Sequence, residues 1–336
     1  MRRRAPLALL FALLAVTATA ATPYAWQLPR GFPEPAVPAD NPMSAAKVAL
    51  GAKLFVDPRL SVTGEYSCQS CHAPQRAFTD GRARSLGATG AVLPLNAPTL
   101  LNAAYSPSLG WNDTGVSSLE QQMRGPLFNQ HPPELGLAGR ELAVEQVLAR
   151  DAGLAREFAA AFPADARAVS MENIIRAIAA YERTLFAGRS AFDRYVFGGD
   201  HAALDAQQKL GMQLFFSERS GCGACHGGIN FAGPWIDAGQ PEAKAVFADT
   251  GTGQSVRVPS LRNLEATAPY MHDGRFASLD AVLDHYERLA VDPATDPRLR
   301  RAPLTTAEQA SLVAFLQSLN EEVVSGGESR DYSGDR

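Results

Sequence analysis

The sequence feature that most constrains this chain is a pair of short motifs, 68-CQSCH-72 and 222-CGACH-226. An even number of cysteines in an exported protein first suggests disulfides. Here, however, the two motifs use all four cysteines of the chain, and C-x-x-C-H is the spacing of covalent c-type haem attachment. The sequence therefore predicts two covalently bound haems c, each with a proximal histidine on its iron. The attachment residues are Cys68, Cys71, His72, Cys222, Cys225 and His226.

The N-terminus has the pattern of a cleaved secretory signal peptide. Three arginines precede an apolar run, and 18-ATA-20 provides a small-residue cleavage site. No later segment approaches the ~20 apolar residues that a membrane-spanning helix needs. We therefore expect an exported periplasmic protein that begins near Ala21 and has no transmembrane segment.

The charge of the mature chain bears on its partners. Removal of Arg2, Arg3 and Arg4 lowers the formal net charge from −4 to −7. An acidic protein is a poor ligand for the phosphate backbone, so we expect no nucleic-acid partner. A surface of this sign weakly favours encounters with basic redox proteins.

Self-comparison indicates an internal duplication. The segment 98-PTLLN-102 recurs as 259-PSLRN-263, and several single positions recur 160 residues later. These pairs are Leu50 and Leu210, Gly51 and Gly211, Leu54 and Leu214, Phe55 and Phe215, Arg59 and Arg219, Asp113 and Asp273, and Leu119 and Leu279. Each unit then contains a helix, a C-x-x-C-H motif, a long loop and a second helix.

Helix-like apolar spacing outnumbers strand patterns, and the loops between are long and rich in Gly and Pro. The clearest helical segments are 44–55, 141–150, 170–185, 205–216 and 305–319, with Ser44, Ser170, Asp205 and Thr305 as expected N-caps. The predicted fold is mostly α, with two tandem cytochrome c-like domains and a join at 187–203. The expected divisions are a signal peptide at 1–20, domains at 21–190 and 191–322, and a flexible tail at 323–336.

The sixth iron position decides the chemistry, because Met or His there favours electron transfer, whereas an open position admits peroxide or dioxygen. In the second unit, Tyr286 lies on the apolar stripe of a helix with Leu279, Val282 and Leu283. His285 points about 100° away on a helix and is expected to be a solvated surface residue. Met271 and His272 precede this helix and are alternative ligands.

The duplication gives a comparison for this position. Tyr286 corresponds to Pro126, which cannot bind iron and is expected to end the helix that carries Leu119, Gln122 and Met123. No histidine occurs between His72 and His131. We therefore expect an open first haem and a second haem closed by Tyr286. The alternative for Tyr286 is an ordinary packed core residue.

The sequence resembles the bacterial di-haem cytochrome c peroxidases and MauG-type enzymes over nearly all of the mature chain. Besides both C-x-x-C-H motifs, the resemblance lies in 96-NAPTLLNAAY-105, 119-LEQQMRGPLFN-129, 134-ELG-136, 182-ERTL-185, 258-VPSLRN-263 and 269-PYMHDGRF-276. Simple peroxidases of the family have Met at the position of Tyr286, and many have a removable His at the position of Ala88. Both departures favour the MauG branch, which has a His/Tyr haem and in which Met271 matches a non-ligand position.

A narrower resemblance lies in the N-terminal run. Residues 28–51 are similar to the MauG relatives associated with methanobactin operons, in which a Trp of a small partner protein is oxidised to kynurenine. This resemblance implies hydrogen peroxide and a small periplasmic protein as substrates. The alternative is a cytochrome c peroxidase that receives electrons from a small cytochrome c or a cupredoxin. A non-enzymatic electron carrier is disfavoured, because a carrier would have both irons capped.

The resemblance also implies roles for residues near the haems. Gln122, on the inward stripe of its helix, and Glu134, which matches the catalytic carboxylate of the family, are the candidates for moving the proton during peroxide cleavage. The loop that carries Glu134 is about two residues longer than in the simple peroxidases; nearby His131 could contribute or be a plain loop residue. Trp111 matches the Trp between the haems, whereas Trp26 and Trp235 have no comparable context. A calcium is implied at Asn96, Thr267 and Pro269.

Overall fold

The computed structural model describes residues 24–113, 115–233, 247–292, 295–299 and 301–321. The predicted signal peptide, Trp235 and the predicted tail lie outside these residues. The described chain is mostly helical with very little sheet, as the sequence predicted. Across these residues, no helix combines the length and the apolar character needed to cross a membrane.

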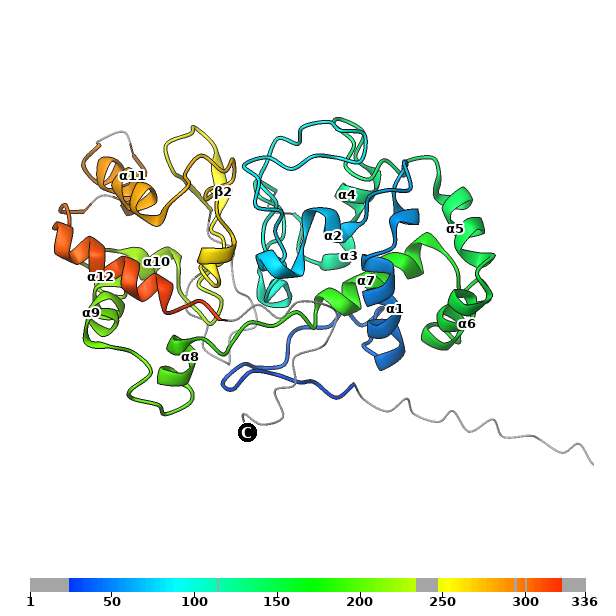
Figure 1. The fold of residues 1–336 in the computed structure, drawn as a ribbon, viewed down its shortest axis with the longest axis horizontal. Coiled ribbons are helices and arrows are strands. Elements are labelled where there is room, and N and C mark those ends of the chain that lie inside the picture. Colours follow the sequence, from blue (N-terminus) through cyan, green and yellow to red (C-terminus); the bar gives the residue numbers. More distant parts are fainter. Residues whose placement is uncertain (1–23, 114, 234–246, 293–294, 300, 322–336) are drawn as a thin grey trace, which may run out of the picture.

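Helices far outnumber strands, and long connections separate them (Figure 1). The α-helices are α1 (Ala45–Phe55), α2 (Cys68–Cys71), α3 (Leu119–Gln122), α4 (Arg124–Phe128), α5 (Glu141–Ala149), α6 (Ala152–Ala161), α7 (Met171–Glu182), α8 (Ala191–Val196), α9 (Ala206–Phe215), α10 (Cys222–Cys225), α11 (Leu279–Val291) and α12 (Thr306–Gln317). Strands β1 (Phe247–Asp249) and β2 (Ser255–Arg257) pair antiparallel, with Ala248 opposite Val256. Short 3₁₀ helices span Pro58–Leu60, Pro74–Arg76, Ala103–Tyr105, Leu264–Ala266 and Pro297–Leu299.

The described chain has two hydrophobic cores, and the helices that contribute to them form two halves in Figure 1, with α1 and α7 in one half and α9 and α12 in the other. The first core contains buried residues between Leu50 and Ala187, and the second contains buried residues between Phe192 and Leu319. The predicted boundary at 190 and 191 falls between them and stays a prediction. The extended segment before α1 crosses from one half to the other, because the Phe32 ring packs on Phe197 of the second half.

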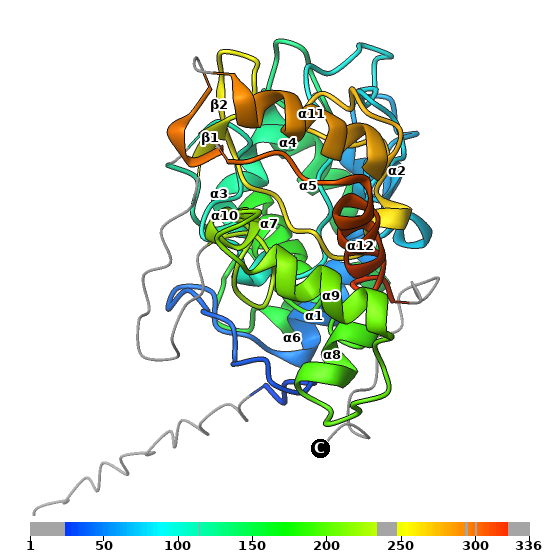
Figure 2. The ribbon, with the colours of Figure 1, turned by 90° about the vertical axis from the view of Figure 1, so that its left-hand side faces the viewer.

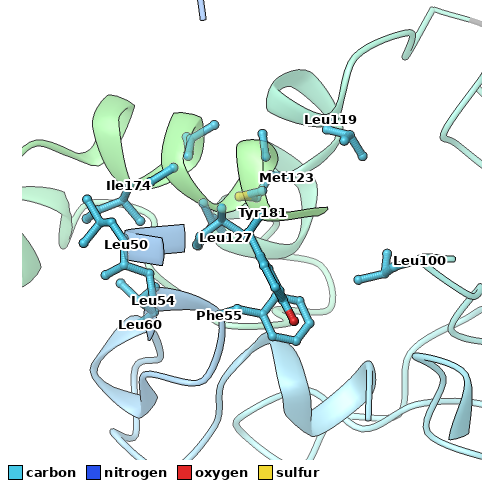
Figure 3. Packing of buried hydrophobic residues seen from close by; sticks show 14 of the residues in the cluster. Leu50, Leu54, Phe55, Leu60, Leu100, Leu119, Met123, Leu127, Ile174 and Tyr181 are labelled. Atoms are coloured by element: carbon cyan, nitrogen blue, oxygen red, sulfur yellow. The ribbon is translucent and has the colours of Figure 1, made fainter. Parts of the chain in front are cut away.

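The duplicated glycines mark the same helix pairing in both halves. In the first half α1 packs on α7, and a Cβ added to Gly51 would collide with the carbonyl oxygen of Ala177. In the second half α9 packs on α12, and a Cβ added to Gly211 would collide with the carbonyl oxygen of Ser311. Figure 3 shows Leu50 of α1 beside Ile174 of α7, and Figure 2 shows α9 beside α12. Glycine is needed here because the helix backbones approach so closely.

The predicted helices form at the expected positions. Four of them also begin at the predicted N-cap residue. The side chains of Ser44, Ser170, Asp205 and Thr305 each accept a backbone N–H bond in the first turn of the helix that follows, as N-cap residues do. Helix α5 also forms within the expected segment, although its N-cap residue, Arg140, makes no such bond.

Helices α6 and α8 are among those that were not predicted from periodicity. Helix α6 follows α5 almost directly, with Asp151 as its cap. Helix α8 lies in the segment that was expected to be the join between the domains. Its residue Asp193 forms a buried ion pair with Arg262 at 2.8 Å, and Ser190 caps its start. A contact made across 69 positions gives no local sequence signal.

The prediction that Pro126 ends the helix carrying Leu119 is wrong. Helix α3 already ends at Gln122, and Pro126 is the third residue of α4. A proline has no N–H to donate to the carbonyl of Gln122, so the helical hydrogen bonds are interrupted. The helical course nevertheless continues, because the N–H of Leu127 donates to the carbonyl of Met123 at 3.2 Å.

Candidate functional site

The two C-x-x-C-H motifs have the same local structure. Each C-x-x-C forms one helical turn, α2 or α10, and the histidine follows as its C-cap. The ring Nδ1 of His72 lies 2.9 Å from the carbonyl oxygen of Phe78, and that of His226 lies 3.0 Å from the carbonyl oxygen of Phe231. A carbonyl can only accept, so Nδ1 is the donor in both rings. The lone pair on Nε2 is then free for a metal.

The electrostatics of these histidines suit the neutral ligand form. Burial lowers the pKa of His72 and of His226, and the hydrogen bonds to backbone carbonyls oppose this only in part. None of the four motif cysteines forms a disulfide. The donor set of each motif, one oriented imidazole beside two free thiols, therefore fits a covalent haem.

One cavity of about 700 Å³ runs between the two halves and connects both motifs. His72 and His226 both line it. The sequence-predicted residues that also line it are Cys71, Asn96, Trp111, Gln122, Glu134, Cys222, Cys225, Thr267, Pro269 and Tyr286. Cys68 instead packs against the first hydrophobic core. The fold thus brings together residues separated by more than 200 positions, and their individual roles remain predictions.

The loop that carries Glu134 lines the cavity, and Glu134 interacts electrostatically with Cys71 of the first motif. The backbone N–H of Ala88 donates to the carbonyl of Glu134 at 2.6 Å, so Ala88 lies directly against this loop. Burial raises the pKa of the Glu134 carboxyl, which favours the protonated form. Gln122 and His131 line the same cavity, so both stay candidates for contact with a molecule bound in it.

On the side of the second motif, α11 carries Tyr286 into the cavity wall. Burial raises the pKa of its phenol, and the nearby thiols of Cys222 and Cys225 raise it further. Without a bound cation the phenol is therefore neutral. Met271 and His272 also line the cavity, so the position of these residues does not by itself choose among the three candidate ligands.

The prediction that His285 is a solvated surface residue is wrong. Its Nε2 lies 2.9 Å from the carbonyl oxygen of Thr250, and its ring centre lies 5.0 Å from that of Phe276. The residue is half-buried. The segment after β1 covers this side of α11, and nothing in the helical periodicity of α11 could have indicated that cover.

Trp111 is held at the junction of the two halves. Its Nε1–H donates to the carbonyl of Asn96 at 2.9 Å, and its own carbonyl accepts the N–H of Arg257 at 2.7 Å. The ring of His272 lies beside it, with ring centres 6.3 Å apart. Trp26, in contrast, packs on Tyr24 and lies outside the cavity wall. Of the two tryptophans in the described residues, Trp111 is thus the one that lines the cavity.

The residues implied for calcium are close to this junction. The side-chain amide nitrogen of Asn96 donates to the carbonyl of Arg82 at 2.7 Å, which directs the amide oxygen to the other side. Thr267 and Pro269 line the same cavity as Asn96. Oxygen donors of this kind suit Ca²⁺, and the site stays a prediction.

Arg257 is the residue that sequence reasoning missed. Its guanidinium carbon lies 5.4 Å from the centre of the Trp111 ring, and it lines the cavity from β2. A strand of three residues gives no usable periodicity, so only the tertiary structure could place this side chain.

Comparisons with known proteins agree with this arrangement. A family model described as di-haem cytochrome c peroxidase matches residues 45–201. The methylamine utilization protein MauG of Methylorubrum extorquens is 36% identical over 303 residues, which cover 88% of this chain and 83% of that protein. The cytochrome c551 peroxidase of Pseudomonas aeruginosa is 38% identical over 257 residues, 72% of each chain. A solved MauG-like protein associated with microbial copper homeostasis superposes with a TM-score of 0.83 at 36% identity, covering 89% of this chain and 96% of that one.

Proposed function

Because this chain belongs to the di-haem cytochrome c peroxidase and MauG family, and is thus a haem-dependent oxidoreductase, we propose that it uses hydrogen peroxide to oxidise a tryptophan of a partner protein. His72 would hold an open haem, and His226 with Tyr286 would hold a closed one. Bound haem supplies the iron that reacts with peroxide and holds the oxidising equivalents. The signal-peptide pattern supports a periplasmic location.

The observation that carries this proposal is the difference between Tyr286 and Pro126. The two residues occupy corresponding positions of the duplicated units, and both line the cavity. A phenol can bind iron after losing its proton, whereas a proline cannot bind iron at all. An anionic phenolate ligand would stabilise high oxidation states, which suits storage of two oxidising equivalents.

The residues of the first unit are suited to handle the protons of peroxide. Burial raises the pKa of Glu134, which favours the protonated carboxyl, and a carboxyl can both donate and take back a proton during catalysis. Gln122 lines the same wall and is an amide that can donate and accept a hydrogen bond without changing charge. We assign proton transfer to Glu134 and orientation of peroxide to Gln122.

Trp111 is placed to connect the two ends of the cavity. Its hydrogen bond to the carbonyl of Asn96, in the first half of the chain, fixes the indole plane. The indole also contacts His272 and Arg257, which are residues of the second half. An indole between two haems would divide a long electron transfer into two shorter ones. We therefore assign electron relay to Trp111.

The class of substrate is supported by likeness to a MauG-like protein associated with microbial copper homeostasis. The resemblance of residues 28–51 to the methanobactin-associated branch supports the same class of substrate. We propose a small periplasmic protein as the partner, with one of its tryptophans as the oxidised group. A cavity of about 700 Å³ is far too small to admit a folded protein, so oxidation would occur by electron transfer through the protein and not by entry of the partner.

A cytochrome c peroxidase is the second candidate. The 38% identity to cytochrome c551 peroxidase favours it, and Met271 lines the cavity as a possible soft ligand. Such an enzyme would detoxify peroxide with electrons from a small cytochrome c or a cupredoxin. Tyr286 and Ala88 disfavour this reading, since simple peroxidases resembling this chain have Met and often His at these positions.

The deciding experiment is to add one equivalent of peroxide to the fully ferric protein without reductant and to follow the Soret and near-infrared spectrum. We expect peroxide to be consumed and a long-lived oxidised species to form. Tyr286→Met is the matched variant and should lose that species. If the wild-type protein reacts only after one haem has been reduced, the proposed function is wrong and the cytochrome c peroxidase is favoured.

A further inference from the structure

Three arginines line the cavity, and they differ in their partners. Arg298 forms an ion pair with Asp296 at 2.6 Å, and Arg301 forms one with Glu287 at 2.6 Å. Within the described part of the chain, Arg257 has no carboxylate and no side-chain hydrogen bond, and its Nε is buried without a partner. Arg257 is therefore the unpaired cation of this wall.

The lack of an ion-pair partner is unusual because Arg257 is buried. The residue is 7% exposed, and burial lowers the pKa of its guanidinium to about 10, which still leaves it charged at neutral pH. The face of Trp111 gives it a cation–π contact at 5.4 Å. The cavity also contains the carboxylates of Asp113 and Glu134, but neither forms an ion pair with it. A buried charge is costly unless an anion compensates it, so a further anionic group is needed here.

We propose that Arg257 binds the carboxylate of a haem propionate beside Trp111. A haem attached at either motif must lie in this cavity, and its propionates are carboxylates that the protein chain does not itself supply. The planar guanidinium fork matches a carboxylate with two parallel hydrogen bonds. This inference deepens the proposed function, because it rests on the two haems and concerns their surroundings.

The pairing has a consequence for the relay. A bare cation over the indole would oppose removal of an electron from Trp111, because like charges would then face each other across a poorly screened contact. A bound carboxylate cancels that charge. Arg257 would thus be a positioning residue: it fixes a propionate and the Trp111 face together, and the local charge stays near zero.

The test uses resonance Raman spectra of the ferric holoprotein, in which the propionate bending bands report hydrogen bonding. Arg257→Gln should shift one of these bands, and Arg257→Lys should shift it less, because an ammonium keeps the charge but loses the fork. Arg298→Gln is the matched control, since Arg298 lines the same cavity but is paired with Asp296. It should leave that band in place.

Two further measurements separate a pairing role from a structural one. Removal of Arg257 should raise the pKa of the propionate toward that of a free carboxyl, so the haem potentials of Arg257→Gln should become pH-dependent where those of the wild type stay flat. Haem content per chain checks that the variants are loaded. If Arg257→Gln folds and loads haem but shows unchanged propionate bands, the inference is overturned.

The same experiment distinguishes the sources of the carboxylate. If a small anion occupied the site instead, the propionate bands would be unaffected by Arg257→Gln, and added formate or chloride would change the wild-type spectrum but not that of the variant. That result would overturn the propionate assignment. If Arg257→Gln fails to fold, the spectrum of Arg257→Lys is the test. An unshifted propionate band in Arg257→Lys would contradict the two parallel hydrogen bonds proposed for the guanidinium. A wild-type protein that contains no haem would instead contradict the proposed function.

Discussion

The two units of this chain hold their C-x-x-C-H motifs in the same local structure and differ in one helix that lines the cavity between them. Phe78 and Phe231 have left-handed backbones with φ of 59° and 51°, and each offers its carbonyl to the proximal histidine. Asn102 and Asn263 share a second left-handed position with φ of 58° and 57°. In contrast, Gly125 and Pro126 of the first unit correspond to His285 and Tyr286 of the second.

This difference between the two units indicates which positions of a duplicated fold can change its chemistry. The attachment loops and the paired helices carry the packing that both units need. Pro126 and Tyr286 line the cavity and belong to neither buried core, so this position can differ between the units. The predictions below test this division, first by breaking what the units share and then by altering what separates them.

The shared helix pairing should be the most sensitive feature. Gly51→Leu and Gly211→Leu each place a side chain against backbone that cannot move aside without separating two helices. We expect each to lower the free energy of unfolding by more than about 3 kcal/mol, or to prevent folding. Thermal unfolding and haem content measure this. Gly125→Ala is the control, because nothing lies within 4 Å of a Cβ there. Tolerance of leucine at either glycine would contradict the equivalence of the two pairings.

Proton handling should belong to the first unit only. Glu134→Gln keeps the shape of the side chain but cannot take up a proton, so we expect the rate of peroxide consumption to fall about 10²- to 10⁴-fold. Stopped-flow mixing of the ferric protein with peroxide measures it. Glu141→Gln, at the start of α5 and outside the cavity lining, is the control. A rate within a factor of two of the wild type would remove Glu134 from the mechanism.

Glu182 is a second difference between the units. Tyr181 of α7 lies against Gly51, and Phe315 of α12 lies against Gly211, so these two residues correspond. Glu182 follows Tyr181, and the buried Leu316 follows Phe315. Burial raises the pKa of Glu182 to about 8, while neighbouring Arg183 partly opposes this. One carboxylate oxygen of Glu182 is buried without a partner.

The folded state therefore binds a proton at Glu182 that the unfolded state releases near its ordinary pKa of about 4.3. The free energy of unfolding should fall as the pH rises from about 5 to 8, by an amount on the order of a few kcal/mol. Glu182→Leu, which makes the first unit like the second, should flatten this dependence and stabilise the protein at pH 8. Melting temperatures at several pH values measure both. An equally steep wild-type and variant profile would contradict the buried carboxyl.

Local signals predicted the parts that depend on local chemistry. The C-x-x-C-H motifs and the capped helices α1, α7, α9 and α12 could be predicted because each depends on residues within a few positions of one another. The duplication could be predicted because similar residues recur at a constant spacing of about 160 positions. The family resemblance added the mostly helical haem-enzyme class, which the comparisons confirm.

The missed features depend on contacts between distant segments. Helix α8 is stabilised through Arg262, Arg257 is placed by a three-residue strand, and Pro126 is accommodated inside a helix that restarts. Amphipathic periodicity describes one helix face against a core and says nothing of a loop that returns to cover the other face. His285 shows this most clearly.

The smallest expected effect concerns that covered face. His285→Ala removes the hydrogen bond to Thr250 and the contact with Phe276, so we expect a loss of about 1 kcal/mol in the free energy of unfolding. The corresponding substitution in the first unit, Gly125→Ala, should cost nothing and could add up to about 1 kcal/mol, because alanine favours the helix.

Burial lowers the pKa of His285, so the unfolded state binds its proton more tightly than the folded state does. The contribution of His285 to stability should therefore be lost as the pH falls below about 6.5, the ordinary pKa of a histidine. The difference between the wild type and His285→Ala should shrink on acidification and be constant above neutrality. A difference that grows at low pH would mean that the imidazolium is the better partner for the Thr250 carbonyl. The side chain would then act as a charged donor on the face of α11 that distinguishes the second unit from the first.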